Sequence, residues 1–365
     1  MRRVGVLPVA LLAVASVIAA IVIANGSASV VSSRSAPVAS DPGRFGVGLS
    51  KVPSGHDYER MARGGVGTVR FVLDWRRVEP QAGGPFRWRQ TDRYIAGAAR
   101  RGVSTLPLLF ATPPWLAHSF IRAPVFSAKA RADWRRFVGA AAARYGRDGA
   151  FWRRHPSLPY DPVRYWQVWN EQNSPDFYGP DPSPSSYLSL LKISSAALRT
   201  ADSRARIVLG GMFEGNVSYG AILSWRFLAR LYQLGGDPYF DVVGAHPYSP
   251  HLSSSEFQVR RLRAAIVHHH DARTPIWIDE IGWGSARGGS PLNDGPEGQA
   301  RKLHRLFRFA QRSRRALRIQ RVLWYPWRDS GHTPEACTFC GSTGLIRRDG
   351  AVKPAWRAFR RIAAN

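Results

Sequence analysis

The amino-acid sequence predicts an α/β fold, a single (β/α)8 TIM barrel, for the part of the chain that follows residue 42. Short β-rich runs alternate with longer amphipathic stretches, which is the pattern of parallel βαβ units. The alternation repeats eight times at about 40 residues per unit, and the 365-residue chain has room for one such barrel. A doubly wound open sheet is the alternative, but Gly46-Val47-Gly48 lacks the third glycine of a phosphate-binding loop.

The predicted strands are rich in β-branched and aromatic residues, and turn-forming segments separate them from the predicted helices. The strand candidates are residues 45–49, 68–75, 104–111, 165–171, 206–212, 240–248, 275–283 and 319–327. The helix candidates are residues 56–64, 91–101, 127–146, 185–201, 220–234, 253–269, 296–315 and 354–363. Asp92 and Ser127 are candidate N-caps, and Pro184 precedes a periodic apolar run, as is typical of helix starts.

The N-terminus has the features of a segment that is directed into a membrane. Arg2 and Arg3 precede an apolar run that extends from residue 4 to residue 24. Residues 1–26 are therefore either a signal peptide or an N-terminal membrane anchor, because the run is just long enough to span a bilayer. Residues 27–42 are expected to form a flexible linker, and residues 43–365 the folded domain. The domain is then extracellular or held at the cell surface.

The chain is strongly basic, with 52 Lys and Arg against 25 Asp and Glu and a net charge of +27. This charge favours anionic surroundings such as an acidic cell-wall polymer. The arginines are spread over every segment and form no single basic block, which favours a solvated Arg-rich surface as their explanation. The sequence contains neither a basic helix with heptads nor a zinc-finger spacing, and we predict no nucleic-acid partner.

The two cysteines of the chain, Cys337 and Cys340, are separated by two residues. An exported protein meets an oxidising environment, which predicts a disulfide between them. A zinc site would need two further ligands at a suitable spacing, and the sequence offers none. The sequence therefore predicts neither a metal nor an organic cofactor.

Two carboxylates stand at the ends of predicted strands. Glu171 closes the fourth strand, and Glu280 lies near the end of the seventh. These strands lie on opposite sides of an eight-stranded barrel, so both side chains can face each other across its mouth. Glycoside hydrolysis needs such a pair, separated by ~5–5.5 Å for retention of configuration and ~6.5–9.5 Å for inversion. Either glutamate alone is equally compatible with a salt bridge, but the two together predict a catalytic pair.

Residues 169–173, Trp-Asn-Glu-Gln-Asn, resemble the acid/base segment of clan A glycoside hydrolases, and residues 278–283 resemble their nucleophile strand. Arg70, residues 112–115 and the His-Pro-Tyr at 246–248 are similar to further motifs of this clan, most of all to family 39 and family 5 catalytic domains. The resemblance covers residues 45 to 330. It implies a retaining O-glycosyl hydrolase that acts on a polysaccharide or oligosaccharide by double displacement.

The same resemblance implies roles for individual residues. Glu171 is expected to be the acid/base with a raised pKa, and Glu280 the nucleophile. Asn170 is expected to bind the 2-hydroxyl of the sugar. Arg70 is expected to keep Glu280 ionised, and Tyr248 to donate a hydrogen bond to it.

Further candidates for substrate binding are His246 and three tryptophans. His246 shares a strand face with Tyr248, although a core histidine bonded to the backbone is the alternative. Trp115 lies in the loop after the third strand, and alternation points either Trp324 or Trp327 of the eighth strand inward as a sugar platform.

Three residues depart from the pattern or extend it. Gln172 stands where proline is usual in the clan. Asp279 adds a carboxylate beside Glu280, and strand alternation predicts that it faces the helices in a structural role. Glu214 is a further carboxylate and a candidate for contact with the substrate. The alternative function is a non-catalytic carbohydrate-binding or cell-envelope scaffold protein on the same barrel.

Overall fold

The computed structural model describes residues 44–214, 219–330 and 337–364. Within these ranges, no helix is long and apolar enough to cross a membrane. The apolar N-terminal segment and the linker lie outside the described residues, so the signal peptide or anchor and the linker stay predictions.

The described strands form one parallel sheet in the order β5-β4-β3-β2-β1-β9-β8-β7-β6. Each strand except the pair β5 and β6 corresponds to one predicted strand. The strands are β1 Phe45–Leu49, β2 Thr68–Asp74, β3 Ser104–Phe110, β4 Tyr165–Val168, β5 Arg206–Leu209, β6 Met212–Phe213, β7 Val243–His246, β8 Ile276–Ile281 and β9 Ile319–Trp324.

The sheet closes on itself through its fifth barrel strand. β5 and β6 are two halves of that strand, interrupted at Gly210 and Gly211, and they occupy the two ends of the strand order. Val208 of β5 bridges to Val242, just before β7, in parallel orientation, and Leu209 N donates to the carbonyl of Val242 at 2.9 Å. The fold is therefore the predicted (β/α)8 barrel.

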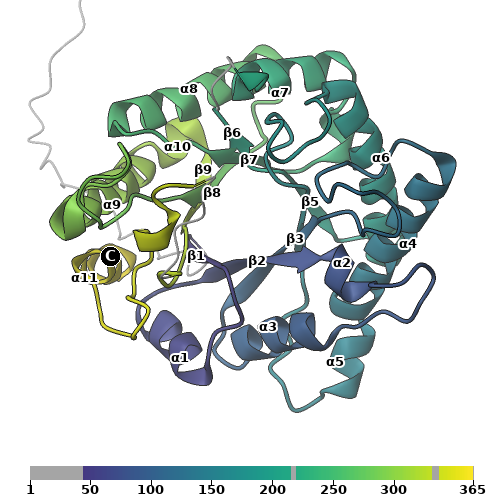
Figure 1. The fold of residues 1–365 in the computed structure, drawn as a ribbon, viewed down its shortest axis with the longest axis horizontal. Helices are drawn as coiled ribbons and strands as arrows, with labels where there is room; N and C mark the ends of the chain where they lie inside the picture. The colour runs from purple at the N-terminus through teal and green to yellow at the C-terminus, as the bar shows by residue number, and fades with distance from the viewer. Residues whose placement is uncertain (1–43, 215–218, 331–336, 365) are drawn as a thin grey trace, which may run out of the picture. The chain divides into compact units, whose positions relative to one another are not determined.

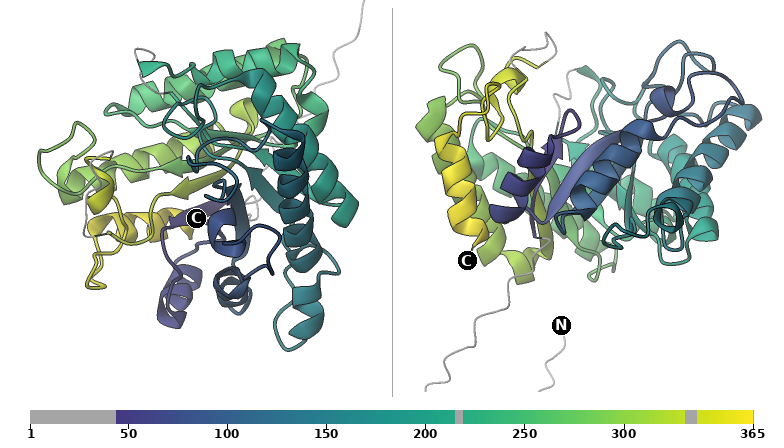
Figure 2. Two further views of the ribbon diagram at one scale, coloured as in Figure 1. Left: turned by 45° about the vertical axis from the view of Figure 1, so that its right-hand side comes forward. Right: turned by 90° about the horizontal axis from the view of Figure 1, so that it is seen from below.

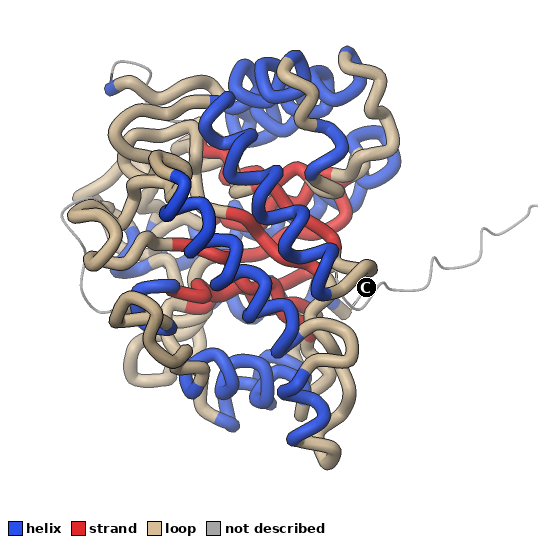
Figure 3. Tube along the Cα trace, turned by 90° about the vertical axis from the view of Figure 1, so that its right-hand side faces the viewer, coloured by secondary structure: helices blue, strands red, loops and turns tan. Residues whose placement is uncertain are grey.

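Helices surround the sheet on its outer side (Figure 1), and the strands are seen behind them from the side (Figure 3). The C-terminal helix lies beside α9 (Figure 2), where the rings of Phe307 and Phe359 are 5.4 Å apart. The helices are α1 Gly55–Arg63, α2 Trp75–Val78, α3 Arg89–Ala99, α4 Ala128–Tyr145, α5 Ala150–Arg154, α6 Pro184–Ala201, α7 Ser224–Gln233, α8 Leu252–His268, α9 Gly295–Arg312, α10 Arg314–Leu317 and α11 Pro354–Ala363, with 3-10 turns η2 Asp237–Tyr239 and η3 Cys340–Ser342.

Two of the predicted helix starts are present in the structure. The side chain of Ser127 caps α4 by accepting from Ala130 N, and Pro184 is the first residue of α6. Asp92 was the wrong cap, because α3 begins three residues earlier, at Arg89. The carboxylate of Asp92 instead accepts hydrogen bonds from Arg144 at 2.8 Å and 3.0 Å, which ties α3 to α4.

The core has two parts. A large apolar cluster fills the layer between sheet and helices, while a small cluster fills the barrel itself. The barrel cluster consists of Leu106, Val208, Val242, Trp277 and Leu323. This filled interior supports the residues at the carboxyl ends of the strands, where barrels of this kind hold their sites.

Candidate active site

Four residues from four different strands meet at the carboxyl end of the barrel. Arg70 lies on β2, Glu171 follows β4, His246 ends β7, and Glu280 lies on β8. Trp169 and Glu171 have left-handed backbone conformations, with φ of 67° and 42°. Such conformations are uncommon for residues other than glycine and cluster at functional sites. The segment that carries Glu171 is thus turned sharply at the end of its strand.

Glu171 is buried, with 6% of its surface exposed. His246 Nδ1 lies 2.7 Å from Glu171 Oε1. Burial raises the pKa of Glu171; the hydrogen bond and charge of His246 oppose this effect, the charge of Glu280 adds to it, and the net pKa is raised. A carboxyl group with a raised pKa keeps its proton at higher pH, which is the property that a general acid needs.

Two donors hold Glu280 in place. Arg70 Nη1 donates to Oε2 at 2.5 Å, and the hydroxyl of Tyr248 donates to Oε1 at 3.1 Å. Burial and the charge of Glu280 raise the pKa of Tyr248 well above its ordinary value, so its phenol stays protonated. One oxygen of Glu280 lies within 4.8 Å of an oxygen of Glu171. The structure therefore places the two predicted catalytic glutamates face to face.

Arg70 links Glu280 to two polar neighbours. Its Nε donates to Gln167 Oε1 at 2.6 Å and its Nη2 to Asn170 Oδ1 at 2.7 Å. Burial lowers the pKa of Arg70, but the charges of Glu280 and Asp279 outweigh burial and raise it. Because Asn170 accepts through its oxygen, its amide NH2 group remains to donate to a sugar hydroxyl.

Asp279 points into the barrel, so the expectation that it faces the helices was wrong. Its Oδ1 accepts from Ala245 N at 2.8 Å, and its Oδ2 lies 3.3 Å from His246 Nε2 and 3.6 Å from Arg70 Nε. Burial alone would raise the pKa of Asp279, but the charge and hydrogen bond of His246 lower it, and Arg70 adds to this effect. Asp279 is a buried, ionised base of the site.

Asp279 follows the alternation set by Trp277, which lies inside the barrel, and an irregularity in β8 explains why Glu280 reaches the mouth as well. β8 pairs Ile278 with Val322 and Ile281 with Trp324, so one more residue stands on β8 than on β9. A bulge of this kind breaks strict alternation. It allows Asp279 to lie inside the barrel while the next residue also reaches the barrel mouth.

His246 lies between the carboxyl groups of Glu171 and Asp279, with its Nδ1 facing Glu171 and its Nε2 facing Asp279. Burial would lower its pKa, but the charges of Glu280 and Asp279 and the two hydrogen bonds raise it to about 10. Gly211 makes room for the ring, since a Cβ there would overlap the imidazole. His246 is thus part of the site and not a core histidine bonded to the backbone.

Glu171, His246 and Glu280 are close enough to one another to offer three ligands to a metal ion. Their protein partners favour another use. Arg70 already donates to Glu280, and His246 bonds Glu171 and Asp279 through its two ring nitrogens. The donor set fits a proton-transfer network better than a cation site.

A cleft of about 370 Å³ opens beside Glu280. Its walls combine residues of the barrel mouth with polar side chains from the segment after β2. They include Arg70, Asn170, Glu280, Tyr325, Asp74, Arg76, Arg77 and Arg87. A volume of this size lies within the usual range of small-molecule sites.

The sugar platform predicted on the last strand is contradicted by the structure. Trp324 and Trp327 are 0% and 3% exposed, and the indole of Trp324 donates to the carbonyl of Thr343 at 2.8 Å. Alternation points Leu323 into the barrel and Trp324 toward the helices, and β9 ends there. Tyr325, which follows the strand, lines the cleft instead.

The remaining candidates lie outside the cleft walls. Trp115 is half-buried and donates to the carbonyl of Glu79 at 2.8 Å. Glu214 follows β6, and burial raises its pKa to about 7. Gln172 is fully buried, and its amide donates to the carbonyl of Gly210 at 3.0 Å. Gln172 therefore bonds the acid/base segment to the interrupted fifth strand.

Sequence reasoning missed Gln167, Tyr325 and the inward role of Asp279. One signal was present for two of them, because Gln167 and Asp279 are polar residues inside apolar strands. A polar side chain within a buried strand must find a partner, and these two bond each other through Gln167 Nε2. Tyr325 carried no comparable signal.

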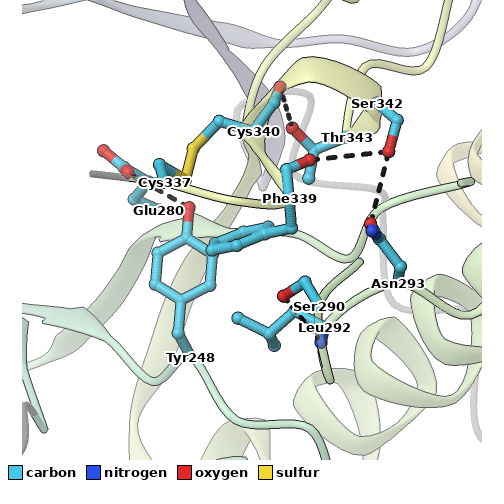
Figure 4. The surroundings of a disulfide bond; sticks show 10 residues. All are labelled: Tyr248, Glu280, Ser290, Leu292, Asn293, Cys337, Phe339, Cys340, Ser342 and Thr343. Carbon is cyan, nitrogen blue, oxygen red and sulfur yellow. Dashed lines mark hydrogen bonds between the residues drawn. A yellow bond between two sulfur atoms is a disulfide. The ribbon is translucent and has the colours of Figure 1, made fainter. Parts of the chain in front are cut away.

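The predicted disulfide between Cys337 and Cys340 is present. Tyr248 and Glu280 are among the residues that surround it (Figure 4). The bridge therefore belongs to the loop after β9 at the mouth of the barrel.

No family model matches this sequence, and no curated protein matches it. The structure, however, is similar to solved glycoside hydrolases. A family 39 glycoside hydrolase from the gut symbiont Bacteroides cellulosilyticus matches with a TM-score of 0.66 at 19% identity, over 89% of this chain and 64% of that one. A monomeric beta-xylosidase from Caulobacter crescentus matches with a TM-score of 0.62 at 18% identity, over 88% of this chain and 68% of that one.

A GH5_18 protein from Bifidobacterium longum, solved in complex with Manb1-4GlcNAc, matches with a TM-score of 0.65 at 16% identity. The match covers 88% of this chain and 78% of that protein. This chain thus spans about two thirds of the length of the first proteins that it matches. The fold is that of clan A glycoside hydrolases, as the sequence motifs implied.

Proposed function

We propose that this protein is an exported retaining glycoside hydrolase that cleaves O-glycosidic bonds of a polysaccharide or oligosaccharide. The carrying observation is the distance of at most 4.8 Å between an oxygen of Glu171 and one of Glu280. Retaining enzymes hold their two carboxyl groups ~5–5.5 Å apart, whereas inverting enzymes need ~6.5–9.5 Å to admit a water molecule, and nearest oxygens this close support the shorter separation. The fold shared with family 39 and GH5_18 proteins supports the same reaction class.

In the first step, protonated Glu171 donates its proton to the glycosidic oxygen. A carboxylate oxygen of Glu280 attacks the anomeric carbon, and the bond from that carbon to the leaving oxygen breaks. Arg70 and Tyr248 hold the two oxygens of Glu280, which fixes the plane of the carboxylate for attack. The product is a covalent glycosyl-enzyme.

In the second step, Glu171 acts as a base. It takes a proton from a water molecule, whose oxygen attacks the anomeric carbon and releases Glu280. Asn170 donates to the 2-hydroxyl through the amide group that Arg70 leaves free. The anomeric configuration is inverted twice and is therefore retained.

His246 and Asp279 prepare Glu171 for both steps. The imidazolium of His246 donates to Glu171 from one ring nitrogen while the other faces Asp279. This arrangement fixes the Glu171 carboxyl group, and His246 reduces the rise in its pKa that burial causes. Glu171 can then both release its proton and recover it.

Export rests on the N-terminal sequence, with residues 1–26 as a cleaved signal or a retained anchor. The net charge of +27 supports retention near an acidic cell-wall polymer. Retention of the protein on acidic and neutral polymers, compared at low and high salt, tests this point. Equal retention on both polymers at low salt contradicts it.

The function is tested with the full-length protein, Glu171→Ala and Glu280→Ala on a panel of activated aryl glycosides and polysaccharides, with and without azide. We expect both variants to lose hydrolysis of unactivated glycans, Glu171→Ala by about 10²–10⁴-fold. Azide should give a glycosyl azide of inverted configuration with Glu280→Ala and of retained configuration with Glu171→Ala, because it replaces the nucleophile in one and attacks the glycosyl-enzyme in the other.

Two outcomes contradict the proposal. Hydrolysis that survives in Glu280→Ala without azide removes the assigned nucleophile. Sugar binding that is equal in all three proteins, without turnover by any of them, supports the non-catalytic scaffold function instead.

A further inference from the structure

The ring of Tyr248 packs against two phenylalanines. The ring of Phe213, at the end of β6, lies edge-on to it with the ring centroids 6.4 Å apart. The ring of Phe339, in the loop after β9, lies edge-on to it with the ring centroids 5.6 Å apart. The hydroxyl of Tyr248 reaches Glu280 at 3.1 Å (Figure 4). The direction of this hydroxyl therefore depends on what packs against the ring.

Phe339 belongs to the bridged segment, Cys337–Cys340. The disulfide joins its two ends, and Cys340 N also donates to the carbonyl of Cys337 at 3.2 Å. Phe339 thus lies inside a small covalent ring, which removes most of the conformations that a free loop would explore.

The downstream side of the bridged segment is bonded to the barrel. Thr343 Oγ1 donates to the carbonyl of Cys340 at 3.0 Å, and Trp324 donates to the carbonyl of Thr343. The ammonium of Lys353, which is 3% exposed, donates to the carbonyl of Ser342 at 2.8 Å. Phe339 is therefore fixed to the strand that carries it and not only to its own loop.

We propose that Phe339 is a positioning residue of the active site: held by the Cys337–Cys340 disulfide, it keeps Tyr248 directed at the nucleophile Glu280. This inference rests on the proposed hydrolase function. It adds a structural element to that function, because the activity becomes dependent on an oxidised bridge that takes no part in the chemistry.

The physical reason lies in the geometry of attack. Glu280 needs one of its oxygens aimed at the anomeric carbon, and a hydrogen bond at each oxygen sets the plane of the group. Arg70 is fixed by three acceptors, whereas Tyr248 has its single hydroxyl contact and its ring packing. Loss of Phe339 opens space on one side of that ring and loosens the weaker of the two donors.

Reduction of the bridge should act in the same way. Dithiothreitol supplies two electrons and two protons, so the disulfide becomes two thiols and the reagent becomes a cyclic disulfide. Phe339 is then held only by the hydrogen bonds on the downstream side of its segment and no longer by the disulfide. The full-length protein, after reduction, should behave as Cys337→Ser/Cys340→Ser does without reduction.

The test is a kinetic comparison of full-length wild type, Phe339→Ala, Phe339→Tyr and Tyr248→Phe on one aryl glycoside that the wild type hydrolyses. We expect Phe339→Ala to lower kcat by about 2- to 12-fold, the range that an edge-to-face aromatic pair can supply, with KM within about twofold. Phe339→Tyr keeps the ring and should restore kcat. Thr338→Ala, an exposed neighbour within the same covalent ring, is the matched control and should leave kcat unchanged.

A double-mutant cycle separates action through Tyr248 from a direct effect. In the Tyr248→Phe background, Phe339→Ala and removal of the bridge should cost nothing further, because the hydroxyl that they position is gone. Effects of Phe339→Ala and Tyr248→Phe that multiply overturn the proposal. A loss confined to KM also overturns it, since Phe339 would then contact the sugar itself.

A second measurement does not depend on turnover. In protein with ring-¹³C tyrosine, the signal missing from Tyr248→Phe is that of Tyr248, and the ring of Phe339 should shift it. A signal unchanged by Phe339→Ala and by reduction refutes the positioning, even if no substrate is found. Failure of the proposed hydrolase function gives a different result: activity persists in Glu280→Ala, while the Tyr248 signal still shifts in Phe339→Ala and on reduction.

Discussion

The substitution Asp279→Asn tests whether the buried charges beside Glu280 form one network. The Asp279 side chain is 0% exposed and accepts from Ala245 N, while His246 and Arg70 both lie close to it. Asparagine keeps the shape but removes the negative charge, which leaves two buried cations with one counter-charge fewer. Breaking a buried pair in this way costs about 3–5 kcal/mol of unfolding free energy.

The pH dependence of this loss follows from the two pKa shifts. The pKa of Asp279 is lowered in the folded state, so its contribution is present above its unfolded pKa of about 3.9 and disappears as pH falls below it. The pKa of His246 is raised to about 10, so its contribution is complete below about pH 6.5 and is lost as pH rises toward 10. The stability gap between wild type and variant should therefore be widest between about pH 4 and 6.5.

Urea unfolding of both proteins across pH 3 to 10 measures this gap. Asp148→Asn is the matched control, because the Asp148 side chain is 82% exposed and its pairing with Arg147 should be worth less than about 1 kcal/mol. A gap for Asp279→Asn below 1 kcal/mol at pH 6, or one that does not vary with pH, refutes the network.

Three further predictions concern the acid/base, a buried lysine and the disulfide. In His246→Asn, the charge of Arg70 alone opposes the burial of Glu171, so the alkaline limb of the kcat/KM profile should move to higher pH; an unmoved or lowered limb contradicts this. Lys353→Met leaves Asp329 without its ammonium partner at 2.7 Å and should cost about 3 kcal/mol in urea unfolding, with a change under 1 kcal/mol as the opposing result. The Cys337–Cys340 bridge closes a very short loop, so its removal should lower the free energy of unfolding by at most about 2 kcal/mol. A much larger loss in thermal unfolding would show that the bridge stabilises more than its own segment.

The sequence was sufficient for the barrel and for four residues that the structure brings together at its mouth. Alternating β-rich and amphipathic runs are local patterns, and eight of them leave few topologies other than a closed barrel. The ends of the strands then place Glu171 and Glu280 at one mouth, since all parallel strands end on the same face. Arg70 and Tyr248 followed from their positions in the same motifs, and the structure places all four together.

The sequence alone could not predict where side chains point when the backbone near them is irregular. Asp279 and Glu280 both reach the inside of the barrel because β8 contains a bulge, and a bulge depends on the register with β9, which is distant along the chain. Trp324 and Trp327 are buried because alternation is set by the inward Leu323 and ends with the strand.

The role of the cysteine segment shows the same division. The expected export of the protein predicted the disulfide between Cys337 and Cys340, the two cysteines of the chain. Nothing in the sequence of this segment indicated that Phe339 meets Tyr248, 91 positions away in the chain. Local patterns determine the elements and the bridge, whereas contacts between loops from different strands exist only once the barrel has closed.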